Sequence, residues 1–389
     1  MCRPLRLPGS SQHSMQPGKP CLIIAQSGRA LAASAALGGL RSHVLDRFAD
    51  QDTVATAVSS LAVSGNESGF HVGELLEKLS FFLGTPLSGV IYGSGLEQQY
   101  DVLEYLDRHW TLLGNEAAVV RTCKEPSLFF PLLTRLGIPY PDTRLTAPSQ
   151  TGGNETWLMK QTGASGGGHI HRIGAGAMTG RRHYFQKKLS GRTLSVVFLA
   201  DGSEATLVGT NELWTVAPEK SDFRYSGAVT VFKLPRSITV MLEDTVRLLV
   251  RELGLRGMCG LDVILDDAGQ CQVLEINPRP TATFELHQTQ HSLCQAHAQA
   301  CNGRLGSWSP APELLQAHQV LYADRDFILP EISWPNWTSD RPYPGRYIHV
   351  HDPICTVHVQ AECMDDVRTQ LQQRSATLMQ LMGLQKLAA

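Results

Sequence analysis

The segment 258–280 constrains the fold of this chain more than any other part of the sequence. Two apolar runs within it flank the turn sequence Asp-Asp-Ala-Gly, which predicts a β-hairpin. Because side chains alternate between the two faces of a strand, Asp262 points away from its apolar neighbours in the first run. The same rule places Val273, Glu275 and Asn277 on one face of the second run. Asp262, Glu275 and Asn277 are therefore expected to project together from one side of the hairpin.

Two carboxylates held this close together need a compensating charge. Like charges about 4 Å apart repel by about 4 kcal/mol at an effective dielectric of about 20, so either one carboxyl is protonated or a cation lies between them. A donor set made of carboxylates and an amide carbonyl suits Mg²⁺, which takes the rest of its ligands from water and nucleotide phosphates. Arg279, between Pro278 and Pro280, can present its planar guanidinium to a carboxylate or phosphate. The alternative is a surface hairpin with solvated acids, which the apolar neighbours of Glu275 disfavour.

A lysine on a predicted strand leads into a glycine-rich turn. Residues 157–168 read Trp-Leu-Met-Lys-Gln-Thr-Gly-Ala-Ser-Gly-Gly-Gly, with Lys160 in the strand. Successive glycine N–H groups can approach phosphate oxygens closely, and Lys160 supplies a positive charge. The spacing matches neither a Walker loop nor a dinucleotide fingerprint, so a flexible hairpin explains this segment equally well when it is taken alone. Lys124, which precedes the helix predicted over 126–136, is also uninformative by itself.

The first third of the chain alternates short apolar runs with helical patterns. The apolar runs predict four strands, at 21–25, 42–45, 88–92 and 110–113. Helical spacing predicts the segments between them, at 30–40, 72–83 and 96–108. Alternation of this kind indicates a parallel α/β sheet over residues 20–115.

The remainder of the chain begins with a well-delimited helix and then becomes rich in strands. The helix over 126–136 has Pro126 at its first position and Gly137 after its last. Residues 156–275 are dominated by predicted strands. Three further helices are predicted, over 238–253, 284–300 and 364–386.

Composition excludes several classes of protein. With 42% hydrophobic and 18% charged residues, the chain has the balance of a folded protein and not of a disordered one. A formal net charge of −2 creates no global field that would attract nucleic acid or an anionic membrane. The 9 cysteines form no C-x-x-C pair, which favours reduced thiols in the cytoplasm. No apolar stretch approaches the roughly 18 residues of a membrane helix. We therefore expect a cytoplasmic protein that binds neither nucleic acid nor membrane.

Two histidine pairs are weaker candidates for a metal site. His287 and His291 lie one turn apart on a predicted helix, and His349 and His351 share a face of a predicted strand. Exposed histidines without a metal are the commoner case. His287 is the better of the four for function, because it follows Arg279 closely along the chain.

Taken in order, these features resemble the ATP-grasp ligases. The resemblance is carried by Lys124, Gly137 at the helix end, Lys160 with its glycine loop, Gln186 to Leu189, Asp262 and the segment Glu275-Ile-Asn-Pro-Arg279. It covers residues 20–300 when the N-terminal α/β segment is taken as the domain that precedes the ATP-grasp fold in this family. It implies an α/β N-terminal domain followed by an α+β ATP-grasp fold.

The resemblance also assigns roles to individual residues. It implies that Asp262, Glu275 and Asn277 hold Mg²⁺ or Mn²⁺, and that Arg279 and Lys160 are catalytic. The residues implied to contact ATP are Lys124, Lys160, Ser165, Gly166, Gly167, Gly168, Gln186, Lys187 and Leu189. Gln186 and Arg192 stand where the family often has acids, which puts the ribose and adenine contacts in doubt more than the metal site.

The function implied by the resemblance is ATP- and Mg²⁺-dependent ligation of a carboxylate to an amine through an acyl phosphate. The substrates are then small molecules, and a homodimer is allowed. Segments 341–345 and 351–357 resemble a narrower group, the carboligase-like ATP-grasp proteins, which include tyramine–glutamate ligases of one-carbon cofactor biosynthesis. Three alternatives stay open: an ATP-grasp phosphotransferase without ligation, a non-catalytic nucleotide-binding protein, and a nicotinamide-dependent oxidoreductase indicated by Ser27-Gly28.

The expected domain organisation follows from these patterns. The expected divisions are a disordered tail over 1–18, an α/β pre-ATP-grasp domain over 19–115, an ATP-grasp domain over 116–305 and a β-rich segment with a closing helix over 306–389. Met15 is an alternative start site within the tail. The identities of the acid and the amine do not follow from the sequence, because loops without a motif form the acceptor pocket.

Overall fold

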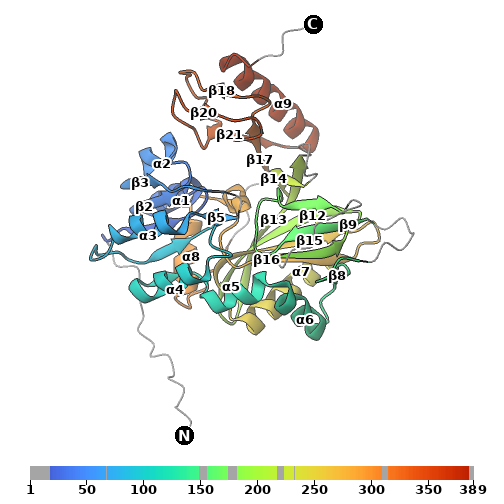
Figure 1. Cartoon of the computed structure of the whole chain (residues 1–389). Helices are drawn as coiled ribbons and strands as arrows, with labels where there is room; N and C mark the ends of the chain where they lie inside the picture. The colour runs from blue at the N-terminus through green and yellow to red at the C-terminus, as the bar shows by residue number, and fades with distance from the viewer. Residues whose placement is uncertain are drawn as a thin grey trace.

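The computed structural model describes most of the chain and arranges it around a parallel N-terminal sheet, a small antiparallel sheet and a large antiparallel sheet (Figure 1). The described ranges are 18–66, 68–148, 156–173, 182–216, 223–231, 233–308 and 314–384. The predicted disordered tail therefore lies outside the described residues, apart from Gly18. Among the described residues, no helix combines the length and the apolar character that a membrane crossing requires.

The N-terminal part is the predicted parallel α/β sheet. Its strand order is β3-β2-β1-β6-β7, and neighbouring strands run parallel. The strands are β1 (Cys21–Ile24), β2 (Ser42–Asp46), β3 (Ser59–Ala62), β6 (Val90–Tyr92) and β7 (Leu112–Leu113). The associated helices are α1 (Arg29–Leu37), α2 (Gln51–Thr56), α3 (Val72–Ser80) and α4 (Tyr100–His109), and a small hairpin joins β4 (Gly65–Asn66) to β5 (Gly69–Phe70). The run Cys21–Ile24 is buried on both faces, which is why it is continuously apolar.

The order of this sheet creates a crevice at one of its ends. The chain adds β2 and β3 on one side of β1, and later adds β6 and β7 on the other side. Open parallel sheets bind their ligands where the order reverses, beside the carboxyl ends of the strands. In this protein that point lies between the ends of β1 and β6.

Two helices lead from this sheet to a small antiparallel sheet. α5 (Ala117–Lys124) is followed by α6 (Pro126–Leu136), whose bounds agree with the prediction. Gly137 ends α6 in the left-handed conformation, with a φ of 68° that a glycine adopts without strain. The small sheet has the order β10-β9-β11-β8. Its strands are β8 (Thr143–Arg144), β9 (Trp157–Gln161), β10 (Ile170–Arg172) and β11 (His183–Lys187).

A large antiparallel sheet forms the centre of the molecule, in the order β16-β15-β12-β13-β14-β17-β21-β19. Its strands are β12 (Arg192–Asp201), β13 (Ala205–Val216), β14 (Arg224–Thr230), β15 (Arg256–Leu265), β16 (Cys271–Asn277), β17 (Leu315–Tyr322), β19 (Thr338–Ser339) and β21 (Pro353–Ala361). The apolar face of α7 (Arg236–Leu253) packs on β12, β15 and β16 and forms the main core with α6. This core fixes the hairpin of β15 and β16 against a rigid support.

The predicted helix over 284–300 is wrong as a single element. A 3₁₀ helix, η1 (Ala282–His287), is followed by a break and then by α8 (Leu293–Cys301). The Ser292 side chain accepts a hydrogen bond from the Gln295 N–H, so it caps α8 and starts a new helix there. η1 contacts β13, β14 and β17, while α8 packs on β15 and α1.

The C-terminal segment continues the large sheet. β17 pairs antiparallel with β14, and β21 and β19 extend the sheet further. α9 (Met364–Leu381) covers β17 and β21, and β18 (Phe327–Ile328) pairs with β20 (Tyr347–Ile348) beside them. Figure 1 shows this region above the junction between the N-terminal sheet and the large sheet.

Candidate functional site

The hairpin of β15 and β16 brings the predicted acids together, with one difference in register. Asp262 pairs directly with Glu275, and Gly260 pairs with Asn277. A β-bulge follows, because Val263 pairs with Val273 and Leu274 is the extra residue. Val273 therefore turns into the core, and the predicted shared face of Val273 with Glu275 is wrong. Bulges of this kind reorient a side chain without breaking the pairing.

The three oxygen-bearing side chains lie within contact of one another. Asn277 Nδ2 is 3.1 Å from Asp262 Oδ2 and 3.5 Å from Glu275 Oε1. Burial and the neighbouring Glu275 raise the pKa of Asp262 to about 7. Desolvation opposes ionisation of Glu275, but Lys124 and Lys160 outweigh it and lower the pKa of that carboxyl. The pair therefore shares its charge unequally, with Glu275 as the ionised member.

Lys124 stands beside these acids at the end of α5. Its Nζ is 2.7 Å from Asn277 Oδ1 and 3.1 Å from Glu275 Oε2, and its side chain is only 3% exposed. Glu275 keeps 40% of its side-chain surface exposed and faces a cavity of about 20 Å³ beside the glycine loop. The Lys124 ammonium thus compensates the acids, and the Asn277 carbonyl oxygen points at Lys124.

Lys160 and Gln186 form a buried pair on the small sheet. β9 carries Lys160 and β11 carries Gln186, and the Lys160 Nζ donates to Gln186 Oε1 over 2.7 Å. Gln186 Nε2 in turn donates to Thr143 Oγ1 over 3.1 Å. Burial lowers the pKa of Lys160. Lys187 and Leu189, at the end of β11 and just beyond it, are half-buried.

The glycine loop lies between Lys160 and the start of β14. Gly166 and Gly167 have φ values of 78° and 77°, in the left-handed region that favours glycine. A Cβ on Gly167 would approach the Phe223 carbonyl oxygen to 1.9 Å, and the Tyr225 N–H donates to Gly166 O over 2.9 Å. Ser165 and Gly166 line a second, larger cavity, and Gly168 follows them.

Arg279 is held by an acid that the sequence reasoning missed. The Arg279 Nε donates to Glu97 Oε1 over 2.5 Å, and the two side chains are 7% and 4% exposed. The Gly95 N–H donates to Glu97 Oε2 over 2.6 Å. Burial opposes ionisation of Glu97, but Arg279 and Lys124 lower the pKa of this carboxyl. Arg279 NH2 also lies 3.4 Å from Asn277 Oδ1, so it belongs to the same cluster. The signal in the sequence was the position of Glu97 just after the strand that borders the sheet crevice.

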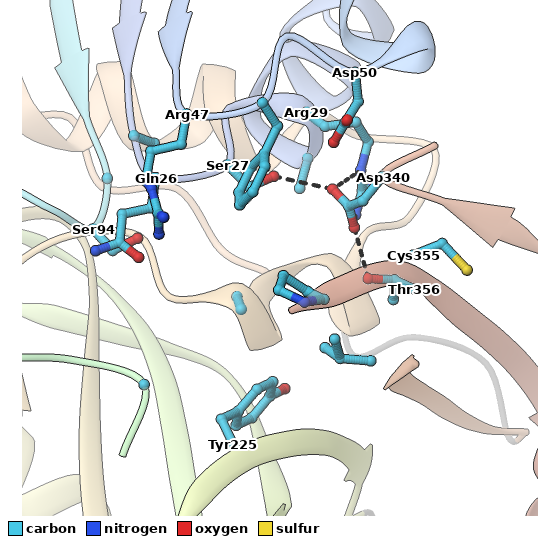
Figure 2. Close-up of a pocket in the computed structure, with 18 of the residues that line it drawn as sticks. Gln26, Ser27, Arg29, Arg47, Asp50, Ser94, Tyr225, Asp340, Cys355 and Thr356 are labelled. Carbon is cyan, nitrogen blue, oxygen red and sulfur yellow. Dashed lines mark hydrogen bonds and ion pairs between the residues drawn. The ribbon is translucent and has the colours of Figure 1, made fainter. Parts of the chain in front are cut away.

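A cavity of about 430 Å³ adjoins this cluster at the crevice of the N-terminal sheet (Figure 2). The ends of β1, β2 and β6, the glycine loop, η1 and the C-terminal segment all contribute to its wall. Arg29 spans it: its NH1 is 2.6 Å from Glu285 Oε2, and its NH2 is 3.1 Å from Asp340 Oδ2. Ser27 Oγ and Thr356 Oγ1 also donate to Asp340, over 3.0 Å and 2.7 Å.

The turn Ser27-Gly28, read as a sign of nicotinamide binding, has a packing role. The Gly28 N–H donates to Asp46 Oδ2 over 3.0 Å. A Cβ on Gly28 would approach Val44 Cγ1 to 2.4 Å, so glycine is needed for the contact of this turn with β2. These contacts account for Gly28 without a dinucleotide.

The histidine pairs are dispersed. His287 is buried, its Nε2 is 3.0 Å from Asn211 Oδ1, and its ring packs on Gly209. His291 lies in the break between η1 and α8 and is exposed, so it does not follow His287 on a helix. β20 ends before His349, and His351 has a φ of 71°, so these two residues do not share a strand face.

Comparison with known proteins identifies the central domain. Residues 127–283 match the family described as ATP-grasp domain. This segment is an ATP-grasp domain. No curated protein sequence matches the chain. The fold of the ATP-grasp domain and its N-terminal partner recurs in N5-carboxyaminoimidazole ribonucleotide synthetase from Thermotoga maritima, at 16% identity and a TM-score of 0.65 over 92% of this chain and 98% of that one.

Two further solved structures share the arrangement. An L-amino acid ligase from Bacillus licheniformis is 13% identical, with a TM-score of 0.68 over 92% of this chain and 97% of that one. The biotin carboxylase domain dimer of Hydrogenobacter thermophilus 2-oxoglutarate carboxylase, in complex with MgADP, ADP and bicarbonate, is 12% identical, with a TM-score of 0.71 over 90% of this chain and 88% of that one. The likeness confirms the predicted fold class, an α/β domain followed by an antiparallel ATP-grasp domain.

Proposed function

We propose that this protein is an ATP- and Mg²⁺-dependent ligase that joins a small carboxylic acid to an amine through an acyl phosphate. The observation that carries the proposal is the cluster of Asp262, Glu275, Asn277, Lys124 and Arg279 at the edge of the ATP-grasp domain. Lys160 approaches the same cluster from the small sheet and contributes to the low pKa of Glu275. Clusters of acids, an amide and cations are what the binding of a metal–triphosphate complex requires.

The donor set fits a divalent magnesium ion. Among the described residues, Asp262 Oδ1 is buried and accepts no hydrogen bond, although a buried carboxylate oxygen without a donor is costly. Asp262 and Glu275 face each other across the hairpin, so a cation between them would remove the need for a shared proton. Asp262 and Glu275 would hold the ion. Asn277 would join them once Lys124 releases the Asn277 side-chain carbonyl oxygen. Bound MgATP would supply the transferable γ-phosphoryl group.

The residues of this chain would contribute positioning and charge. Lys124 and Lys160 would bind the phosphates, and the glycine loop from Ser165 to Gly168 would cover them and exclude water. Arg279, fixed by Glu97, would hold the acyl phosphate in place. Gln186, Lys187 and Leu189 are proposed to line the nucleotide base. No nucleophilic side chain is needed, because phosphoryl transfer depends mainly on orientation and charge neutralisation.

The fold comparisons support ligation. The proteins with a similar fold include an L-amino acid ligase and a ribonucleotide synthetase, and the biotin carboxylase domain dimer is a complex with MgADP, ADP and bicarbonate. The resemblance of segments 341–345 and 351–357 to carboligase-like proteins narrows the proposal to the class that includes tyramine–glutamate ligases. Both substrates are then small molecules, and a homodimer is part of the proposal.

A phosphate-release screen tests the proposed function. Purified protein is incubated with MgATP and paired panels of acids and amines, and phosphate and product are measured. Phosphate release that needs both an acid and an amine is expected. Glu275→Gln should reduce the rate at least about 100-fold, because it removes the ionised member of the acid pair. Glu252→Gln, which alters an exposed ion pair on α7, is the matched control and should leave the rate unchanged.

The other outcomes separate the alternatives. ADP release with an acid alone, giving a stable phosphorylated product, would assign a phosphotransferase. ATP binding without turnover for any pair would assign a non-catalytic nucleotide-binding protein. A Glu275→Gln variant with the wild-type rate would refute the metal assignment.

A further inference from the structure

Three polar side chains form a chain of contacts along the wall of the larger cavity. Tyr225 lies on β14, His318 on the adjacent strand β17, and Glu285 on η1, which packs over both strands. The Tyr225 hydroxyl is 2.5 Å from His318 Nε2, and His318 Nδ1 is 3.1 Å from Glu285 Oε1. The second contact has the distance of an ion pair but not the geometry of a hydrogen bond. Figure 2 shows Tyr225 across the cavity from Arg29 and Asp340.

The chain of contacts has a defined direction. Burial opposes ionisation of Glu285, but Arg29 and His318 outweigh it and hold the pKa of this carboxyl well below its usual range. An ionised carboxylate cannot donate a hydrogen bond, so Glu285 favours the tautomer of His318 that carries its hydrogen on Nδ1. His318 Nε2 then accepts the hydroxyl hydrogen of Tyr225. The phenol is therefore connected to an imidazole that lies beside a carboxylate, the arrangement of a proton-accepting relay.

This relay ends close to the proposed reacting centre. The Tyr225 N–H donates to Gly166 O, so the tyrosine is attached to the loop that would cover the phosphates. Glu285 follows Arg279 by six positions, and the cavity wall includes Pro280 and Ser165. The Asp262 carboxyl also acts electrostatically on Tyr225. A substrate in the cavity would therefore have one end at the acyl phosphate and would lie along the relay.

We propose that the larger cavity binds the amine substrate and that Tyr225 is a catalytic residue, with His318 and Glu285 as its positioning residues. This inference rests on the proposed function. The amine nitrogen attacks the acyl carbon, a C–N bond forms, and the C–O bond to phosphate breaks with its electron pair on the leaving phosphate. The ammonium form of the amine first loses one proton to the Tyr225 oxygen while the Tyr225 proton passes to His318 Nε2, which frees the nitrogen for attack; the second proton lost by nitrogen leaves with the phosphate. Glu285 stabilises the resulting imidazolium.

The groups around His318 favour this role over a metal site. Ligand atoms of Glu285, His318 and His358 lie within 4.8 Å of one another, which could hold a metal ion. However, the Arg29 guanidinium contacts both Glu285 oxygens, at 2.6 Å and 3.2 Å, and would repel a cation there. His358 Nε2 is 2.6 Å from Ser339 Oγ and so already has a hydrogen-bond partner. Arg29, which also binds Asp340, keeps the Glu285 carboxyl ionised, so this carboxylate can act on His318.

The test uses two acceptors that differ in their need for a base. Hydroxylamine is uncharged at neutral pH and attacks an acyl phosphate unaided, whereas an alkylamine is protonated and needs a base. The full-length protein is incubated with MgATP, each of the twenty standard amino acids as carboxylate, and either hydroxylamine or an amine panel of methylamine, ethanolamine and the same amino acids. Tyr225→Phe removes only the hydroxyl. Tyr347→Phe removes an exposed hydroxyl that donates to Asp326, outside the cavity, and is the matched control.

The expected result is a split between the acceptors. Amine ligation by Tyr225→Phe should fall about 100-fold, the usual contribution of a general base, while hydroxamate formation stays within about twofold of the wild-type rate. If Tyr225→Phe lost the same factor in rate with both acceptors, or lost no rate with the amine, the relay would be overturned. Tyr347→Phe should match the wild type with both.

A measurement without substrates decides the proposal when no amine is consumed. Long-range ¹⁵N–¹H NMR spectra of histidine-labelled protein, assigned with His318→Gln, should show His318 as the Nδ1–H tautomer. An Nε2–H tautomer, or a stoichiometric metal ion that His318→Gln removes, would overturn the proposal. Absence of hydroxamate in the wild type, by contrast, counts against a ligase that activates an amino-acid carboxylate, while the tautomer still tests the relay.

Discussion

Glu97 and Asp50 illustrate what single residues contribute that sequence patterns do not reveal. Both follow strands of the N-terminal sheet, and both are buried. Glu97 meets Arg279 across 182 positions of the chain. No local rule predicts such a partner, whereas Asp262 and Glu275 could be paired from alternation and a turn, because they belong to one hairpin. The predictable part of the site is therefore the local part.

The pH dependence of stability should report the burial of Asp50. Burial, together with Asp340, raises the pKa of Asp50 to about 8, although Arg346 lies 3.2 Å away. Between the usual pKa of an aspartate and 8, the unfolded chain releases this proton while the folded protein keeps it. The contribution of Asp50 to the free energy of unfolding therefore falls as pH rises through this window and is lowest above pH 8.

Asp50→Asn should remove this dependence. Urea unfolding at pH 5 and pH 8 is expected to show that the wild type loses at least about 1 kcal/mol more stability across the interval than the variant does. Asp101→Asn, an exposed change on α4, serves as the control and should follow the wild type. If the free energy of unfolding changed equally between pH 5 and pH 8 in the wild type and in Asp50→Asn, Asp50 would be ionised in the folded protein over that whole interval.

At the scale of elements, the signals at helix ends separate the correct predictions from the wrong ones. α6 agrees with its predicted bounds because Pro126 and Gly137 mark its two ends. The helix predicted over 284–300 fails because Ser292 caps a new helix in the middle of an apolar pattern. The hairpin was predicted, but its bulge at Leu274 was not, because a rule of strict alternation contains no extra residues.

The bulge gives a prediction at the same scale. Deleting Leu274 would leave Asp262 opposite Glu275 and Val263 opposite Val273, now as a regular ladder. The fold should persist, with an unchanged circular dichroism spectrum, but the local twist that aims Glu275 would be lost. Because a misplacement of about 1 Å can cost roughly 100-fold in rate, ATP turnover should fall by about that factor. The change Leu274→Ala, which keeps the bulge, is the control; equal rates for the deletion and the substitution would contradict a role for the bulge.

At the scale of the whole molecule, Asp340 joins the C-terminal segment to the N-terminal sheet across the larger cavity. Its carboxylate binds Arg29, 311 positions away, and the N–H groups of Asp340 and Arg341 donate to Asp52 over 2.8 Å and 3.1 Å. Contacts across such separations depend on the assembly of all parts of the fold. This is why the sequence indicated the parts and their order but not the network that closes the cavity.

Asp340→Asn should weaken this connection and identify what it does for the substrate. Asparagine also tolerates the left-handed backbone of this position, whose φ is 56°, so the local conformation is kept while the charge opposite Arg29 is lost. The substitution removes one partner of a partly buried ion pair while Arg29 keeps its contact with Glu285, so amides of β19 and β21 should exchange hydrogen faster. The KM for the acceptor amine should rise about tenfold, while the KM for ATP stays within about twofold. Asp324→Asn, which breaks an exposed pair with Arg325, should change neither quantity. Unchanged exchange and an unchanged acceptor KM in Asp340→Asn would mean that apolar packing alone holds the C-terminal segment in place, and that the cavity is shaped without the Arg29–Asp340 pair.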